Sequence, residues 1–78
     1  MKPIEITPEM KANHFIEWFD ISAKTEEDKR MSPLYAGKIA YEIGRTHNIM
    51  SPGHSNYIAN FFAKVESICK KEFIKRNR

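Results

Sequence analysis

The stretch MSPLYAGKIAYEIG, residues 31–44, has a near counterpart in MSPGHSNYIANFFA, residues 50–63. In both, a Ser-Pro pair precedes apolar residues spaced three and four apart, as on one face of a helix. A serine or threonine N-cap accepts a hydrogen bond from an amide one turn in, and a proline at the first helical position has no amide to leave unpaired. Thr7-Pro8 repeats this signature nearer the start of the chain. Three such starts in one short chain predict an all-α protein.

The apolar pattern after each start predicts three helices, over residues 8–24, 33–47 and 52–75. Residues 1–7 are expected to form an extended lead-in. Thr25 and the three acids after it are expected to cap a short extra helical turn near residues 26–31. A chain of 78 residues supports one hydrophobic core at most, so we expect a single domain over residues 1–78. The predicted fold class is a small three-helix bundle.

Helical wheels assign most of the large apolar residues to the core. From the first helix, the residues expected to face inward are Ala12, Phe15, Ile16, Trp18, Phe19 and Ala23. From the second helix they are Tyr35, Ala36, Ile39, Ala40 and Ile43, and from the third Ile58, Phe61, Phe62, Val65, Ile68, Cys69 and Phe73. Gly37 and Gly44 leave room for a neighbouring helix to approach closely.

The reactive side chains do not form a catalytic pattern. The chain has no G-x-S-x-G, no glycine loop for phosphates and no paired carboxylates. Cys69, the single cysteine, falls in the apolar stripe of the third helix, where a reactive thiolate is not expected. His47 and His54 are seven residues apart across a proline and a glycine, which is not the spacing of zinc ligands. We therefore expect a non-enzymatic protein with no catalytic residue, no metal and no cofactor.

The sequence also bears on location. No apolar segment approaches the ~20 residues of a membrane span, and MKPIEITPEM lacks the apolar run of a signal peptide. One cysteine cannot form an intramolecular disulfide, which favours a reducing compartment. The prediction is a cytoplasmic protein without membrane contact.

The segment KIAYEIGRTHNIM is the basis for a nucleic-acid-binding alternative. Ala40, Gly44 and Met50 have approximately the spacing of a helix-turn-helix. Pro52 and Gly53, however, fall where a recognition helix should run unbroken. The candidate nucleic-acid contacts of this degenerate motif are Arg45, His47 and His54.

Positive charge concentrates in the third predicted helix. Residues 1–30 carry a net charge of −2, whereas residues 64–78 carry +4. Four of these cations follow one flank of the helix and form a basic ridge, Lys64, Lys71, Lys75 and Arg78. The ridge either binds an acidic partner or is a solvated helix end that complements the helix dipole. Because the apolar stripe loses coherence after Phe73, the last turns are expected to be free to bind or to fray.

Two apolar residues, Ile21 and Tyr41, lie away from the main arcs of their helices and are candidate partner contacts. The leading interpretation is a helical protein–protein interaction module that acts as an adaptor, inhibitor or regulator. The alternative is a nucleic-acid-binding regulator that uses the degenerate helix-turn-helix and the basic ridge. A homodimer is a third interpretation, because self-association would add to so small a core.

Overall fold

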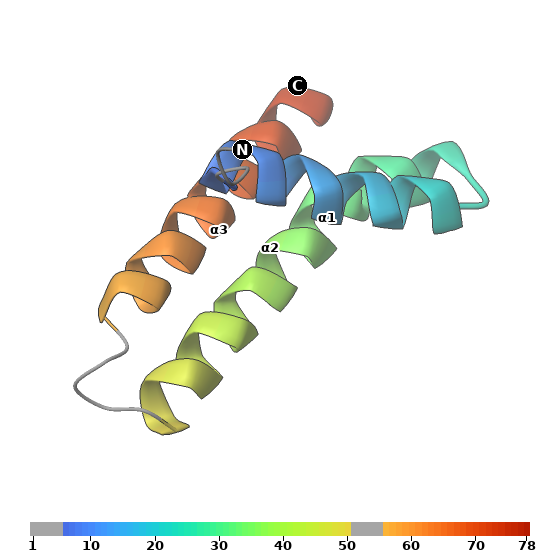
Figure 1. Ribbon diagram of the computed structural model, residues 1–78. Helices are drawn as coiled ribbons and strands as arrows, with labels where there is room; N and C mark the ends of the chain where they lie inside the picture. Colours follow the sequence, from blue (N-terminus) through green and yellow to red (C-terminus); the bar gives the residue numbers. More distant parts are fainter. Residues whose placement is uncertain (1–5, 51–55) are drawn as a thin grey trace, which may run out of the picture.

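Three helices make up the part of the chain that the structure describes. The computed structural model describes residues 6–50 and 56–78, with side chains over 6–46 and 57–78. The helices are α1 (Pro8–Ser22), α2 (Glu26–Met50) and α3 (Asn56–Arg76). α2 and α3 lie side by side in opposite directions, and α1 crosses one face of this pair (Figure 1). The predicted all-α three-helix bundle is confirmed.

α1 begins where the capping signature predicts. The Thr7 Oγ1 accepts a hydrogen bond from the amide of Met10 at 3.2 Å, and Pro8 occupies the first helical turn. The helix ends two residues earlier than predicted, because Ala23 already has an extended backbone. α3 ends one residue later than predicted, and its expected first residues, 52–55, lie outside the described part of the chain.

The start of α2 differs from the prediction. Ser32-Pro33 has the signature of a helix start, yet the helix already begins after Thr25 and runs through this pair. The Thr25 Oγ1 supplies the N-cap by accepting from the amide of Asp28 at 3.0 Å. The Ser32 hydroxyl instead donates to the carbonyl of Asp28 at 3.2 Å, a bond made inside a helix. The extra turn expected near residues 26–31 is therefore the first part of α2, and the prediction of a helix start at residue 33 is wrong.

A proline inside a helix removes one backbone hydrogen bond, and side chains from the end of α3 replace it. Pro33 has no amide to offer the carbonyl of Lys29, four residues earlier. The Arg76 Nη1 donates to that carbonyl at 2.7 Å, and the Asn77 Nδ2 donates to the carbonyl of Arg30 at 3.3 Å. α2 changes direction in its first third (Figure 1), and these two donors stabilise the bend.

Arg76 also ties α3 to α1. Its Nη1 and Nη2 donate to the two carboxylate oxygens of Asp20 at 2.9 and 3.0 Å, and its Nε donates to Glu72 at 2.9 Å. We call Asp20, Glu72 and Arg76 the Arg76 cluster. The hydrogen bonds from Arg76 are the main reason why the pKa of Asp20 lies below its ordinary value. The last turns of α3 are thus anchored, and the expectation that they would be free is wrong.

α2 and α3 approach closely at two glycines. A methyl group added at Gly37 would lie 3.4 Å from the Cβ of Cys69, and one added at Gly44 would lie 3.4 Å from the Cβ of Phe62. We call this contact line, Gly37 and Gly44 against Phe62 and Cys69, the α2–α3 seam. The close approach expected from the glycines is confirmed, as is the burial of Cys69.

The buried core consists mostly of small residues. Its fully buried apolar members are Ala12, Ile16, Ala36, Ala40, Val65 and Cys69, with Phe15, Phe19, Phe61, Phe62 and Ile68 packed partly buried against them. Because α1 crosses the α2–α3 pair, it covers only a short length of each helix (Figure 1). The residues that the helical wheels wrongly assign to the core, and that are exposed, are Trp18, Tyr35, Ile39 and Ile43.

None of the nine aromatic side chains is fully buried. The chain has five Phe, three Tyr and one Trp, all within the described residues, and each is half-buried or exposed. Aromatic side chains usually contribute most to the stability of a small core. The five phenylalanines are partly buried, whereas Trp18, Tyr35, Tyr41 and Tyr57 are exposed.

Candidate binding groove between α2 and α3

Two adjoining cavities follow the α2–α3 seam on a side that α1 does not line. The first has a volume of about 470 Å³ and is lined by Pro33, Leu34, Gly37, Lys38, Tyr41, Glu42, Glu66 and Lys70. The second has a volume of about 390 Å³ and is lined by Ala40, Tyr41, Gly44, Arg45, Ala59, Phe62, Ala63 and Glu66. Tyr41 and Glu66 belong to both, so the cavities form one groove, which we call the α2–α3 groove.

Small residues give the groove its depth. Gly37 and Gly44 add no side chain to the lining from α2, and Ala59 and Ala63 add only a methyl group each from α3. The lining of α2 runs from Pro33 to Arg45, a span of roughly 18 Å at the rise of an α-helix. The groove is therefore about three helical turns long.

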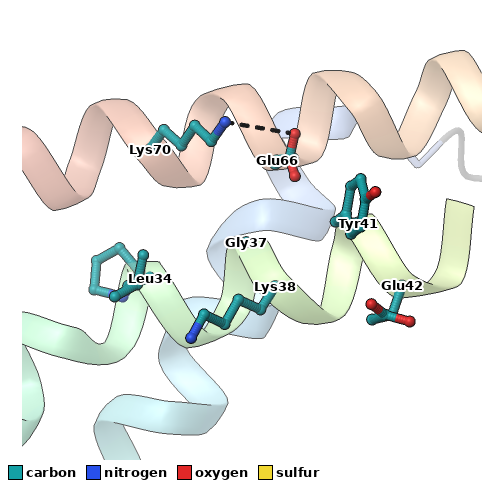
Figure 2. Close-up of a pocket in the computed structure, with 8 residues that line it drawn as sticks. Leu34, Gly37, Lys38, Tyr41, Glu42, Glu66 and Lys70 are labelled. Carbon is teal, nitrogen blue, oxygen red and sulfur yellow. Dashed lines mark ion pairs between the residues drawn. The ribbon is translucent and has the colours of Figure 1, made fainter. Parts of the chain in front are cut away.

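Tyr41 stands at the junction of the two cavities. Its side chain is 54% exposed, and Figure 2 shows the ring between α2 and α3, near Glu66. A large, half-exposed aromatic ring with a hydroxyl at its tip can pack against an apolar group and donate a hydrogen bond at once. Tyr41 therefore occupies the middle of the groove.

The charges along the rim are mostly paired with one another. The Lys70 Nζ lies 3.8 Å from Glu66 (dashed in Figure 2), and Arg45 lies 3.5 Å from Glu42. Lys38 forms no ion pair with any other residue that the structure describes. The groove thus combines an apolar floor with a near-neutral rim, which suits an apolar ligand with few charges.

The two apolar contact residues predicted from the sequence are both exposed but lie apart. Tyr41 lines the groove, whereas Ile21 lies on α1 and borders a shallow polar cavity beside Arg76. Leu34, Lys38 and the small residues of the floor complete the groove and were not predicted as contacts. Gly37 and Gly44 were the available signal, since close helix approach at a glycine leaves a depression beside it.

The basic ridge lies outside the groove. Lys64, Lys71 and Lys75 are exposed and share one flank of α3, whereas Arg78, also exposed, lies two residues beyond the end of the helix. Among the candidate nucleic-acid contacts, Arg45 lines the second cavity. His47 lies in α2 where the backbone alone is described, and His54 lies outside the described residues. Of these three, only Arg45 can be placed relative to the ridge, and it lies on α2 in the lining of the groove.

The groove contains no group with the reactivity of a nucleophile. Cys69, beneath its floor, is buried, and burial raises the pKa of its thiol to about 11, so it is protonated at neutral pH. Within residues 6–50 and 56–78, no three His, Cys, Asp or Glu residues are close enough to hold a metal ion.

Three comparisons with known proteins complete the description of the site. No protein-family model matches the chain, and no curated protein or solved structure matches it either. In the described part of the chain, none of the helices has both the length and the apolar character needed to cross a membrane. The function must therefore be inferred from the surface of the molecule itself.

Proposed function

We propose that this chain is a non-enzymatic protein–protein interaction module that receives a helix of a partner protein in the α2–α3 groove. Such a module would serve as an adaptor, inhibitor or regulator, in a reducing, cytoplasmic setting that suits the unpaired thiol of Cys69. The observation that carries the proposal is Tyr41, an aromatic side chain that is 54% exposed in the middle of an apolar groove. Aromatic residues left at a surface are the common anchors of protein interfaces.

The shape of the α2–α3 groove favours a helix as its occupant. It is long, open and apolar, with Tyr41 in the middle and a cavity on each side. A helix laid in a groove presents apolar side chains at intervals of three, four and seven residues, which would fill successive cavities. α1 already packs across the α2–α3 pair elsewhere, so a bound helix would extend the same kind of packing.

Replacing Tyr41 with alanine is expected to abolish capture of the partner, because it removes the contact shared by both cavities. A buried aromatic anchor of this kind contributes about 2 kcal/mol or more, which is roughly a 30-fold loss of affinity. The measurement is a pull-down from native lysate with tagged protein, analysed by mass spectrometry. The matched control is Ile74→Ala, since Ile74 is a large, 59% exposed apolar residue outside the groove.

One half of each lysate is treated with nuclease before the pull-down. A stoichiometric protein that survives nuclease, is retained by Ile74→Ala and is lost with Tyr41→Ala would support the groove as the docking site. Equal retention of that protein by both variants would rule the groove out.

A second candidate function rests on the basic ridge. Lys64, Lys71 and Lys75 are exposed on one flank of α3, and the exposed Arg78 follows two residues after the helix ends, so the four could contact phosphates. In this case the protein would bind generic duplex, with affinity that falls steeply as salt rises. The triple variant Lys64→Glu, Lys71→Glu, Lys75→Glu is expected to lose that binding in a gel-shift titration. Duplex binding that persists in the triple variant would eliminate the ridge as a nucleic-acid site.

A further inference from the structure

A cavity separate from the α2–α3 groove lies where the start of α1 meets α3 (Figure 1). It has a volume of about 290 Å³, near the lower limit of the pockets that hold small ligands. The start of α1 contributes Ile6 and Pro8 to its lining, and α3 contributes Tyr57, Asn60, Phe61 and Lys64. We call it the Tyr57 cavity. No described residue belongs to both this cavity and the groove.

The Tyr57 cavity contains the kinds of side chain that hold an unpaired base. Tyr57 is 78% exposed, so its ring is open to stacking by a flat ligand. Asn60 has an amide that both donates and accepts hydrogen bonds, as the edge of a base requires. Lys64 is an exposed cation beside them, placed for the phosphate attached to that base. The volume suits one base rather than a larger ligand.

Lys64 also connects the Tyr57 cavity to the basic ridge. Tyr57, Lys64 and Lys71 follow one another at intervals of seven residues, and Lys75 comes four residues later. All four therefore project from one side of α3. From Tyr57 to Lys75 this line is roughly 27 Å long at the rise of an α-helix. We call Lys64, Lys71 and Lys75 the ridge lysines; the exposed ring of Tyr57 stands at one end of them.

The ridge lysines are not neutralised by the acids of their own helix. α3 contains two acids, and both are engaged elsewhere. Glu66 pairs with Lys70 at 3.8 Å, and Glu72 pairs with Arg76 at 2.9 Å. The ridge lysines form no ion pair with any residue within the described ranges 6–46 and 57–78. In contrast to the near-neutral rim of the groove, this line of cations suits a polyanion.

We propose that the Tyr57 cavity and the ridge lysines together bind a single-stranded nucleic acid, with one unpaired base in the cavity and phosphates along the lysines. The bases of a duplex are stacked on their neighbours, whereas those of a single strand are free to stack on an aromatic side chain. An acidic protein segment would pair with the lysines but would make no use of the ring and amide beside them. The inference rests on the ridge as a phosphate-binding surface, as the second candidate function does, and not on the groove.

The test is a fluorescence anisotropy titration with labelled strands of about 12 nucleotides, a length within the range of known single-strand sites. A DNA strand and an RNA strand of one sequence are compared with the duplex of that sequence and with a strand of equal length that lacks bases. We expect the better of the two single strands to bind at least tenfold more tightly than the duplex or the abasic strand. Three phosphate contacts predict a slope of about −2 for the logarithm of the binding constant against that of salt concentration. Equal affinity for strands with and without bases would overturn the proposal.

Replacing Tyr57 locates the base. Tyr57→Ala is expected to weaken single-strand binding about tenfold and to leave duplex binding unchanged, whereas Tyr57→Phe keeps the ring and should bind like the wild type. The side chain is 78% exposed, so its removal does not disturb the core. The matched control is Tyr41→Ala, which removes the exposed tyrosine of the groove. Equal single-strand affinity of the Tyr57→Ala and Tyr41→Ala variants would contradict the proposed cavity.

The variants also separate this inference from the two functions proposed above. If single-strand binding were lost in the triple lysine variant but kept in Tyr57→Ala, the ridge would remain a phosphate-binding surface and the cavity would be ruled out. Capture of a partner in the groove depends on Tyr41 and should be unaffected by Tyr57→Ala.

Discussion

Replacing Arg76 with alanine is expected to lower the free energy of unfolding by about 2–3 kcal/mol, a large share of the stability of so small a domain. The variant loses both bonds to Asp20, the bond to Glu72 and the bond that replaces the one missing at Pro33. Arg76 and Asp20 are only 26% and 29% exposed, so water does not fully take over these contacts. Thermal unfolding should show a midpoint roughly 10–20 °C lower.

Arg78→Ala is the matched control for Arg76→Ala. It removes an exposed arginine two residues further on, and its effect is expected to stay within about 0.5 kcal/mol. The loss of stability in Arg76→Lys should lie between those of Arg76→Ala and Arg78→Ala. An ammonium group keeps the charge but cannot donate to both oxygens of Asp20 in the same way. Equal melting temperatures for the Arg76→Ala and Arg78→Ala variants would show that the Arg76 cluster does not stabilise the fold.

Replacing Gly37 with leucine is expected to cost about 2–3 kcal/mol, because the first carbons of the added side chain crowd α3. An added Cβ would lie 3.4 Å from the Cβ of Cys69 and 3.9 Å from the carbonyl oxygen of Glu66, and leucine attaches a branched carbon to that atom. The effect is measured as a loss of unfolding free energy in a denaturant titration.

Gly37→Ala separates this packing effect from the conformational effect of losing a glycine. Alanine fits the contact distance at the seam and raises helix propensity by up to about 1 kcal/mol, so this variant should be as stable as the wild type or more so. If leucine were tolerated as well as alanine, the two helices would not be as close as the seam requires.

Local sequence patterns were sufficient to predict the fold class, but they were not sufficient to predict the residue at which α2 begins. The cap at Thr7, the cap at Thr25 and the closeness of helices at Gly37 all depend on residues within a few positions or on one small side chain. Ser32-Pro33 reads as a helix start because nothing nearby shows what would satisfy the carbonyl of Lys29. The donor is Arg76, 47 residues further along the chain, and no short-range pattern contains it.

The wrong assignment of some exposed residues to the core has a different cause. A helical wheel identifies the apolar side of a helix. How much of that side is buried depends on how the helices cross. With α1 lying across the pair, Ala12 and Ile16 are buried while Trp18 is left outside. Tyr41 was recognised as exposed, whereas the groove around it depends on how closely α2 and α3 approach and is visible only once they are packed.

The bend at Pro33 divides α2 into parts that are held by different forces. Residues 26–31 contain no buried apolar side chain, and the hydrogen bonds from Arg76 and Asn77 attach them to α3. Beyond Pro33, α2 is held by its close packing against α3 along the α2–α3 seam. Amide protons of the first part should therefore exchange with solvent through a local opening that leaves the rest of the molecule intact. Exchange of this kind would divide one continuous helix into two cooperative units.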